Sequence, residues 1–375
     1  MTKTPFKLAG VWPEGYADTM NVTAAFTLDL AFTGTARLRI AAGQVYRLFV
    51  GGKLAGYGPA RAAAGYVRLD GYNLRLSGDT RIVVEVASYR INSYYLMNAA
   101  PFFAVHLTAG ERTYTAADFT AHIVTDRVRK VQRFSFQRCF TEVYNQHADK
   151  AAFYRGDVSP YSAVPVVSAE VPAVLPRGVG YPRFRGINAR LFERGVFSPD
   201  GTGEVWNDRL FDISDKLLGY KREELESRLT DPLYSYRYTK TDGVRKPLKT
   251  VAVLKAGGYT VSELPQTKTG FLRLNAEVET DSEIVLLFDE ILWEEEKNLR
   301  YENGAANVSF YRNACSQAIK WTLSQGSYEL LTFEPYTAKY IKVLCTKGSA
   351  HVSGVGIVTY ENADAHTKLK IPDTV

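Results

Sequence analysis

The sequence predicts an all-β protein made of two tandem β-sandwiches with little helix. Two observations carry this prediction. Apolar and polar residues alternate with a period of two in many short segments, which is the pattern of strands that bury one face. The 375 residues also include 24 Tyr and 19 Phe, and aromatic side chains favour the half-buried surface of a sheet.

The first third of the chain contains the clearest strands. Thr35–Ile40 places Ala36, Leu38 and Ile40 on one face, and Arg81–Ala87 alternates in the same way. Val45–Val50 is followed by Gly51-Gly52-Lys53, which is typical of a tight hairpin turn. An antiparallel sheet with one solvated face is expected here.

A basic and aromatic stretch follows. From Val131 to Tyr144 the even positions are largely aromatic, which predicts a long strand with an aromatic face. Arg127–Arg138 contains no acidic residue, and basic residues with interleaved aromatics could also contact a nucleic acid. Strand alternation explains the same pattern, and the formal net charge is only +6, so no nucleic-acid partner is expected.

The middle of the chain is expected to connect the two sandwiches. Between residues 151 and 183 the alternation fades and prolines accumulate, which indicates a crossing segment. The best helix candidate is Asp212–Arg228, with Ser214 as a possible cap and loosely recurring leucines.

A second run of strands completes the chain, at spacings typical of a β-sandwich. These segments are Lys249–Leu254, Gly270–Val278, Glu283–Phe288, Gln317–Leu323, Tyr328–Phe333, Lys339–Cys345 and His351–Val358. We therefore expect a first sandwich over 1–165, a Pro-rich crossing over 166–185, a second sandwich over 186–362 and a tail over 363–375.

Several function classes lack their usual signals. There is no Gly-rich phosphate loop, no HExxH motif and no Cys/His metal spacing, so no cofactor is predicted. The scattered carboxylates give no position for a structural Ca²⁺ ion. Residues 1–7 show no apolar signal sequence and no stretch is long and apolar enough for a membrane span, so a cytoplasmic protein without a membrane partner is expected.

The richest carboxylate region is Asp289-Glu290 followed by Glu294-Glu295-Glu296. Glycoside hydrolysis needs two carboxyl groups facing each other across a sugar. Adjacent strand residues point to opposite faces, so Asp289 and Glu290 do not suit one site. No catalytic pair is predicted. A glycosidase built on sandwiches alone would have to use Asp289, Glu290 and Glu294.

Two aromatic, amide-containing loops are the candidates for carbohydrate binding. A sugar site combines flat aromatic surfaces with Arg and Asn donors. The alternative is that these loops pack against the neighbouring domain or the Pro-rich crossing. The candidate residues are Arg61, Tyr66, Tyr89, Asn92, Tyr94 and Tyr95.

Several blocks resemble known proteins. Val45–Gly56 resembles the strand and hairpin of jelly-roll or galactose-binding-like domains. The blocks 56–61, 85–96, 175–179, 286–292 and 333–344 resemble the N-terminal region of bacterial α-L-rhamnosidases of the inverting family-78 type. Together they span about residues 45–345.

The resemblance implies a non-catalytic region. Members of that family continue into an (α/α)6 barrel with the catalytic residues, and no long amphipathic helix is visible in this sequence. We therefore expect an accessory β-sandwich region that supports such a C-terminal catalytic domain, contacts carbohydrate such as a rhamnose-containing glycan, and is inactive alone. None of the family's catalytic residues maps to a position here. The alternative is a free-standing carbohydrate-binding protein.

Overall fold

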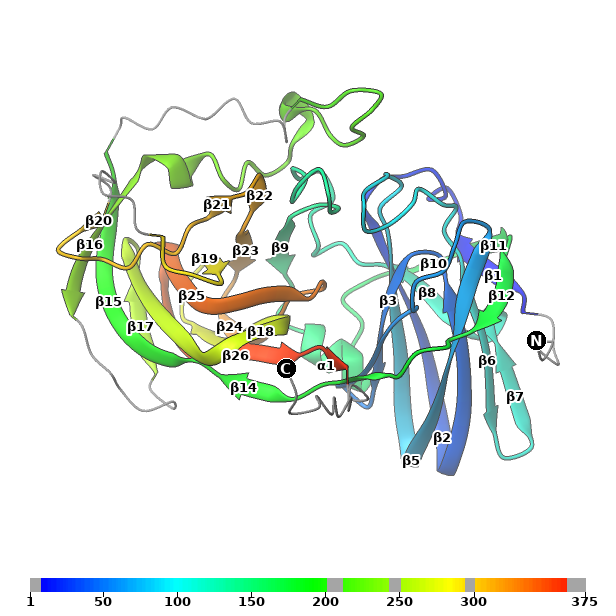
Figure 1. Ribbon diagram of the computed structural model, residues 1–375. Coiled ribbons are helices and arrows are strands. Elements are labelled where there is room, and N and C mark those ends of the chain that lie inside the picture. Colours follow the sequence, from blue (N-terminus) through cyan, green and yellow to red (C-terminus); the bar gives the residue numbers. More distant parts are fainter. Residues whose placement is uncertain (1–7, 201–211, 243–250, 294–300, 363–375) are drawn as a thin grey trace, which may run out of the picture.

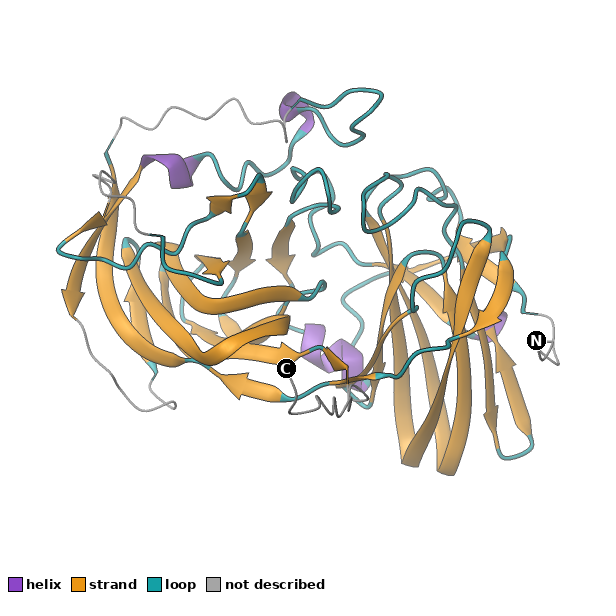
Figure 2. Ribbon diagram, in the orientation of Figure 1, coloured by secondary structure: helices purple, strands orange, loops and turns teal. Residues whose placement is uncertain are grey.

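The computed structural model describes residues 8–200, 212–242, 251–293 and 301–362, and it confirms the all-β class (Figures 1 and 2). The strands form two groups that lie side by side. Within the described residues, the α-helix α1 (Lys150–Arg155) is the only one, and it lies between the two groups.

The first group is organised by two long strands, β2 (Val22–Ala42) and β5 (Tyr66–Ser88). They pair antiparallel from Val22 opposite Ser88 to Ile40 opposite Asp70. The first part of β2 also pairs with β8, and its last part pairs with β6. The other strands are β1 (Gly10–Pro13), β3 (Val45–Val50), β4 (Lys53–Gly58), β6 (Phe103–Ala109), β7 (Arg112–Thr115), β8 (Thr120–Ile123), β10 (Ala163–Val164), β11 (Val166–Ala169) and β12 (Ala173–Pro176).

The hairpin expected at Gly51-Gly52 is confirmed. β3 and β4 pair antiparallel on either side of it. Gly51 and Gly52 have φ angles of 53° and 80°, the left-handed region that glycine enters without a steric penalty.

The second group is organised by β18 (Gly258–Val278). Its first part pairs with β15 and β25, and its last part pairs with β24 and β26. The register with β25 shifts between Glu263 and Lys268, where Pro265 cannot donate a ladder hydrogen bond. The other main strands are β9 (Glu142–Gln146), β14 (Gly186–Asn188), β15 (Arg190–Pro199), β16 (Tyr236–Asp242), β17 (Ala252–Lys255), β19 (Ser282–Asp289), β20 (Tyr301–Glu302), β23 (Ala318–Leu323), β24 (Gly326–Leu331), β25 (Tyr336–Lys347) and β26 (Ser349–Thr359).

Two small ladders lie beside these sheets. β13 (Pro182–Arg183) pairs with β27 (Glu361–Asn362), and β21 (Tyr311–Arg312) pairs with β22 (Cys315–Ser316). Short 3-10 turns occupy Ala116–Asp118, Arg222–Glu224 and Pro232–Ser235.

The long strand predicted over Val131–Tyr144 is wrong, because only Glu142–Gln146 is a strand and residues 131–141 form a looped segment. The Ser135 hydroxyl accepts the backbone N–H groups of Gln137 and Arg138 at 3.2 and 3.0 Å. The Arg133 guanidinium donates to the carbonyl of Arg138 at 2.8 Å. Such local side-chain bonds satisfy backbone groups that a strand would pair with a neighbour.

The helix predicted over Asp212–Arg228 is also wrong. Only Arg222–Glu224 forms a 3-10 turn. The Ser214 hydroxyl accepts the backbone N–H of Leu217, and the Ser214 N–H donates to the Leu217 carbonyl, which closes a turn instead of a helix. Of the leucines that suggested a helix, Leu229 is buried in a hydrophobic core, and Leu218 and Leu225 pack against it.

Strand pairing crosses the domain boundaries expected from the sequence. β9 lies parallel to β23 and so belongs to the second sheet, although it precedes residue 165. β11 and β12, at residues 166–176, pair with β1 and β5 of the first group. The division of the chain into separate domains stays a prediction.

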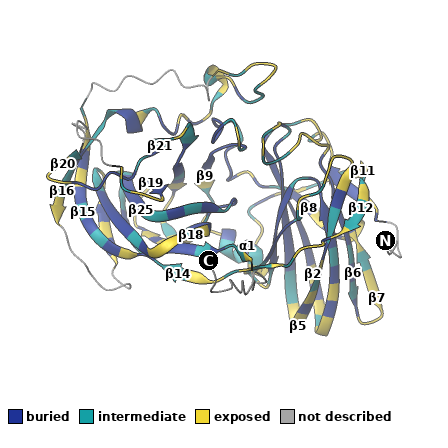
Figure 3. Ribbon diagram, in the orientation of Figure 1, coloured by how far each residue is buried: buried dark blue, intermediate teal, exposed yellow. Residues whose placement is uncertain are grey.

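Buried side chains form a core within each group and a third core that both groups share (Figure 3). The shared core joins Tyr57 and Ile91 of the first group to Phe271, Leu287 and Phe333 of the second. Because burying each large apolar side chain contributes about 1.5–3 kcal/mol, this core couples the two groups strongly.

Candidate functional site

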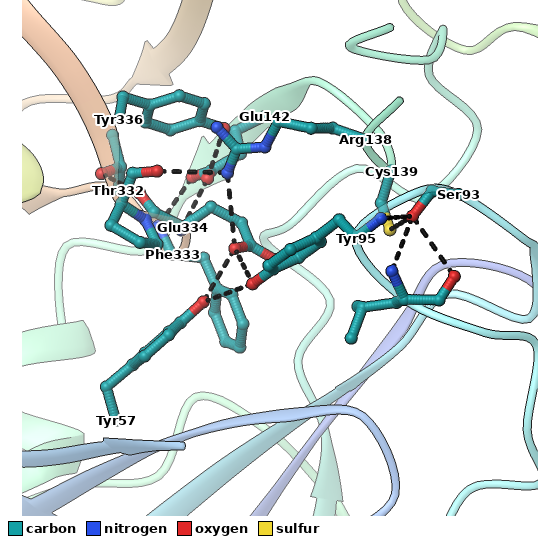
Figure 4. A network of polar contacts seen from close by, with 12 residues as sticks. Tyr57, Ser93, Tyr95, Arg138, Cys139, Glu142, Thr332, Phe333, Glu334 and Tyr336 are labelled. Atoms are coloured by element: carbon teal, nitrogen blue, oxygen red, sulfur yellow. Dashed lines mark hydrogen bonds and ion pairs between the residues drawn. The ribbon is translucent and has the colours of Figure 1, made fainter. Parts of the chain in front are cut away.

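The two groups of strands meet at a junction that contains many polar contacts. Its centre is the loop between β24 and β25, residues 332–335. Glu142 of β9 is fully buried and accepts the backbone N–H groups of Phe333 and Glu334 at 2.7 and 2.8 Å, as well as the Tyr336 hydroxyl at 2.8 Å. These bonds hold the backbone of the loop in place (Figure 4).

The Phe333 ring contacts two guanidinium groups. The Cζ atoms of Arg47 and Arg127 each lie 4.6 Å from the ring centroid. Arg47 also donates to the Thr332 carbonyl at 3.0 Å. Arg47 of β3 thus contacts a loop of the second group through a cation–π contact and a hydrogen bond.

Glu334 carries its carboxylate into a cluster of tyrosines from the first group (Figure 4). It accepts the hydroxyls of Tyr57 at 2.7 Å and Tyr95 at 3.0 Å, and also the hydroxyl of Tyr89. The Arg138 guanidinium lies 3.6 Å away. Burial, and then the charge of Glu334, raise the pKa values of the three tyrosines well above their usual range, so each remains a neutral donor.

A second network lies beside α1. Glu85 binds Arg47, Lys150 and the Tyr154 hydroxyl, and Lys150 also contacts Asp126 at 3.1 Å. Burial alone would raise the pKa of Glu85, but Arg47 and Lys150 bring it down to about 2.

The buried carboxylates of the described residues therefore all have hydrogen-bond or ion-pair partners inside the protein. Asp289 is representative, because Arg312 binds both of its oxygens, with Nε 2.8 Å from Oδ2. Glu290 is exposed, and Glu294 lies outside the described residues. The set is Asp70, Glu85, Asp126, Glu142, Glu193, Asp289 and Glu334.

The structure places the six predicted sugar-contacting residues in different surroundings. Tyr89 is fully buried in the Glu334 cluster. Tyr95 is partly buried there, with the Arg61 guanidinium 4.4 Å from its ring centroid. Asn92 is exposed and accepts the backbone N–H of Asn98. Tyr66, at the start of β5, is 49% exposed.

Tyr94 presents the most open aromatic face of this set. It is 80% exposed, and its ring lies nearly perpendicular to the ring of Phe136 at a centroid distance of 5.9 Å. The structure therefore does not gather the six residues into one site. The alternative interpretation of these loops is packing against the neighbouring domain. Such packing explains the burial of Tyr89 and the partial burial of Tyr95.

A groove of about 260 Å³ opens near the Glu334 cluster. The sequence does not predict this groove. The rings of Phe134, Phe288 and Tyr336 form part of its wall, with Phe288 and Tyr336 centroids 4.8 Å apart. Arg138 lies over Phe134 and Tyr336, and Glu290 adds an exposed carboxylate. Phe134 lay in the aromatic stretch noticed in the sequence, but its partners are more than 150 residues away in the chain.

The described residues also bear on metal sites and membrane spans. They contain no group of three or more His, Cys, Asp or Glu side chains placed to hold one metal ion. Within the same residues, no helix has the length and apolar character required for a membrane crossing.

Comparison with known proteins gives structural likeness only. No protein-family model and no curated protein matches the sequence. The family-78 rhamnosidase of Bacillus sp. GL1 matches 95% of this chain with a TM-score of 0.72 and 12% identity, and 55% of its own chain is covered.

Other solved structures agree with this likeness. The α-L-rhamnosidases of Dictyoglumus thermophilum and Aspergillus terreus match 96% of this chain with TM-scores of 0.51 and 0.52, both at 13% identity. This chain spans 35% and 37% of their lengths. It therefore has the fold of one part of these proteins, as the sequence resemblance predicted.

Proposed function

We propose that this chain is an accessory, non-catalytic β-region of an α-L-rhamnosidase-like glycoside hydrolase, which supports a catalytic barrel and contacts carbohydrate. The observation that carries the proposal is the match of 95% of this chain to 55% of a family-78 rhamnosidase. The engagement of the buried carboxylates in internal bonds supports it, because a glycosidase needs an acid and a base that reach the substrate.

Hydrolysis of an aryl rhamnoside tests the proposal. The purified chain should release no p-nitrophenol from p-nitrophenyl α-L-rhamnopyranoside above the rate of a mock purification. The matched variant Glu290→Gln removes the exposed carboxylate of the groove and should behave identically. Hydrolysis by the parent chain that disappears in Glu290→Gln would show a catalytic site on the sandwiches and overturn the proposal.

A second candidate function is a free-standing carbohydrate-binding protein. The exposed ring of Tyr94 favours it, because exposed aromatic faces stack on sugars. Titration with a rhamnose-containing oligosaccharide should then give millimolar or tighter binding that weakens at least tenfold in Tyr94→Ala. Tyr66→Ala, at the other exposed tyrosine, is the comparison variant. Equal binding by the parent and Tyr94→Ala would exclude a site on this loop.

A further inference from the structure

A second and larger cavity, of about 480 Å³, lies between the two groups of strands. This volume is within the range of small-ligand sites. The β3–β4 hairpin and α1 form one side, and β18 and β24 form the other. The polar residues that line it include Lys53, Gln146, Tyr154, Arg273, Asn275 and Glu329.

The cavity wall has an excess of positive charge. Arg47 and Lys150 are matched by the buried Glu85 and Asp126, and Arg155 pairs with Asp157 at 3.0 Å. Within the described part of the chain, Lys53 and Arg273 have no carboxylate within ion-pair distance. Glu329 is the one acidic residue that lines the cavity.

Arg273 is the most distinctive of these cations. It projects from β18 and is half-buried, and one of its terminal nitrogens donates to the Asn188 side chain. Its Nε atom is buried and has no hydrogen-bond partner in the described residues. Arg273 lines the cavity and is only half-buried, so the exposed part of its guanidinium can donate to an anionic ligand oxygen.

The opposite wall includes two aromatic side chains, of which Phe49 is buried. The rings of Phe49 and Tyr154 stack at a centroid distance of 4.1 Å and an interplanar angle of 13°. Gln146 and Asn275 add amide donors and acceptors. These amide groups suit the hydroxyl groups of a sugar, and the guanidinium suits an oxyanion.

We infer that this cavity binds a saccharide carrying one anionic group, with the Arg273 guanidinium as the partner of the anion. A uronic-acid carboxylate and a sugar phosphate share this chemistry. The saccharide part of the inference rests on the proposed function, whereas the anion part rests on the cavity alone.

Matched pairs of probes test the inference by calorimetric or saturation-transfer titration. D-Galacturonate is compared with D-galactose, and glucose 6-phosphate with glucose; inorganic phosphate is titrated alone. The acidic member of at least one pair should bind at least tenfold more tightly than its neutral partner, and the two pairs distinguish carboxylate from phosphate. Equal affinity within both pairs overturns the inference. Binding of inorganic phosphate without any sugar overturns its saccharide part.

Variants locate the site. Arg273→Gln should weaken binding of the acidic probe at least tenfold. The affinity of Arg273→Lys should lie between those of the parent and Arg273→Gln, because lysine keeps the charge but loses the planar, bidentate guanidinium. Arg75→Gln makes the same charge change at an exposed position of β5 and should leave binding unchanged. Thermal unfolding of each variant verifies folding. Unchanged binding in a folded Arg273→Gln variant would exclude this cavity as the binding site. Rhamnoside hydrolysis remains the separate test of the proposed function.

Discussion

At the scale of single residues, Lys342 is the most unusual group. It is fully buried on β25, and its ammonium lies 4.2, 4.7 and 4.9 Å from the ring centroids of Tyr238, Tyr259 and Tyr301. Its Nζ donates to the Ala306 carbonyl at 2.7 Å. Burial lowers the pKa of Lys342 to about 7, against the opposing charge of Glu193.

This environment predicts a pH dependence of stability. Lysine in the unfolded chain has a pKa near 10.4. Above pH 7 the unfolded state therefore binds more protons than the folded state, and the free energy of unfolding should rise with pH by up to about 1.4 kcal/mol per pH unit from this group. Lys342→Met should lose this contribution, as measured by urea unfolding between pH 7 and 8.5.

The stabilities of the parent chain and Lys342→Met are compared only between pH 7 and 8.5, because another group titrates above that range. Burial raises the pKa of Cys139 to about 12, so above pH 9 its thiol lowers stability in both proteins. The difference between parent and variant isolates Lys342. Identical pH profiles would mean that Lys342 stays protonated in the folded state.

At the scale of elements, the turn between β21 and β22 combines Asn313 and Ala314, with φ angles of 53° and 55°. Asparagine tolerates this left-handed region, but the Cβ of alanine is disfavoured there. Ala314→Gly should therefore raise the free energy of unfolding by about 0.5–1 kcal/mol, measured by denaturant titration.

A matched variant controls for the general effect of glycine. Ala173 is an exposed residue of β12 without a positive φ, so Ala173→Gly should lower stability by a similar amount. If both substitutions destabilise the chain, the strain assigned to Ala314 is absent.

At the scale of the whole molecule, Glu334 joins the two groups of strands. Its carboxylate accepts hydroxyls from Tyr57, Tyr89 and Tyr95 of the first group. Glu334→Gln removes the charge that these donors and Arg138 surround, so stability should fall by on the order of 3 kcal/mol. Calorimetry should show one transition in the parent chain and a lower unfolding temperature in the variant.

The control for this change is Glu277→Gln, an exposed glutamate on β18. Surface substitutions of this kind change stability by no more than about 0.5 kcal/mol. A Glu334→Gln variant as stable as Glu277→Gln would show that the junction is held by apolar packing without a contribution from the carboxylate.

The candidate sites could be read from the sequence only in part. Arg61, Tyr94 and Tyr95 were noticed because of their residue types, but their exposure could not be known. The groove beside Phe134 and the cavity beside Arg273 were missed, because their walls come from strands that are far apart in the chain.

Local periodicity and local backbone conformation in the sequence predict the all-β class, several of the main strands and the Gly51-Gly52 hairpin. The pairing of β9 with the second sheet, and the inward direction of Tyr89 toward Glu334, 245 residues away, depend on contacts that form only in the folded protein. A buried carboxylate needs donors from whichever segments surround it, and that requirement acts through space without leaving a periodic signal in the chain.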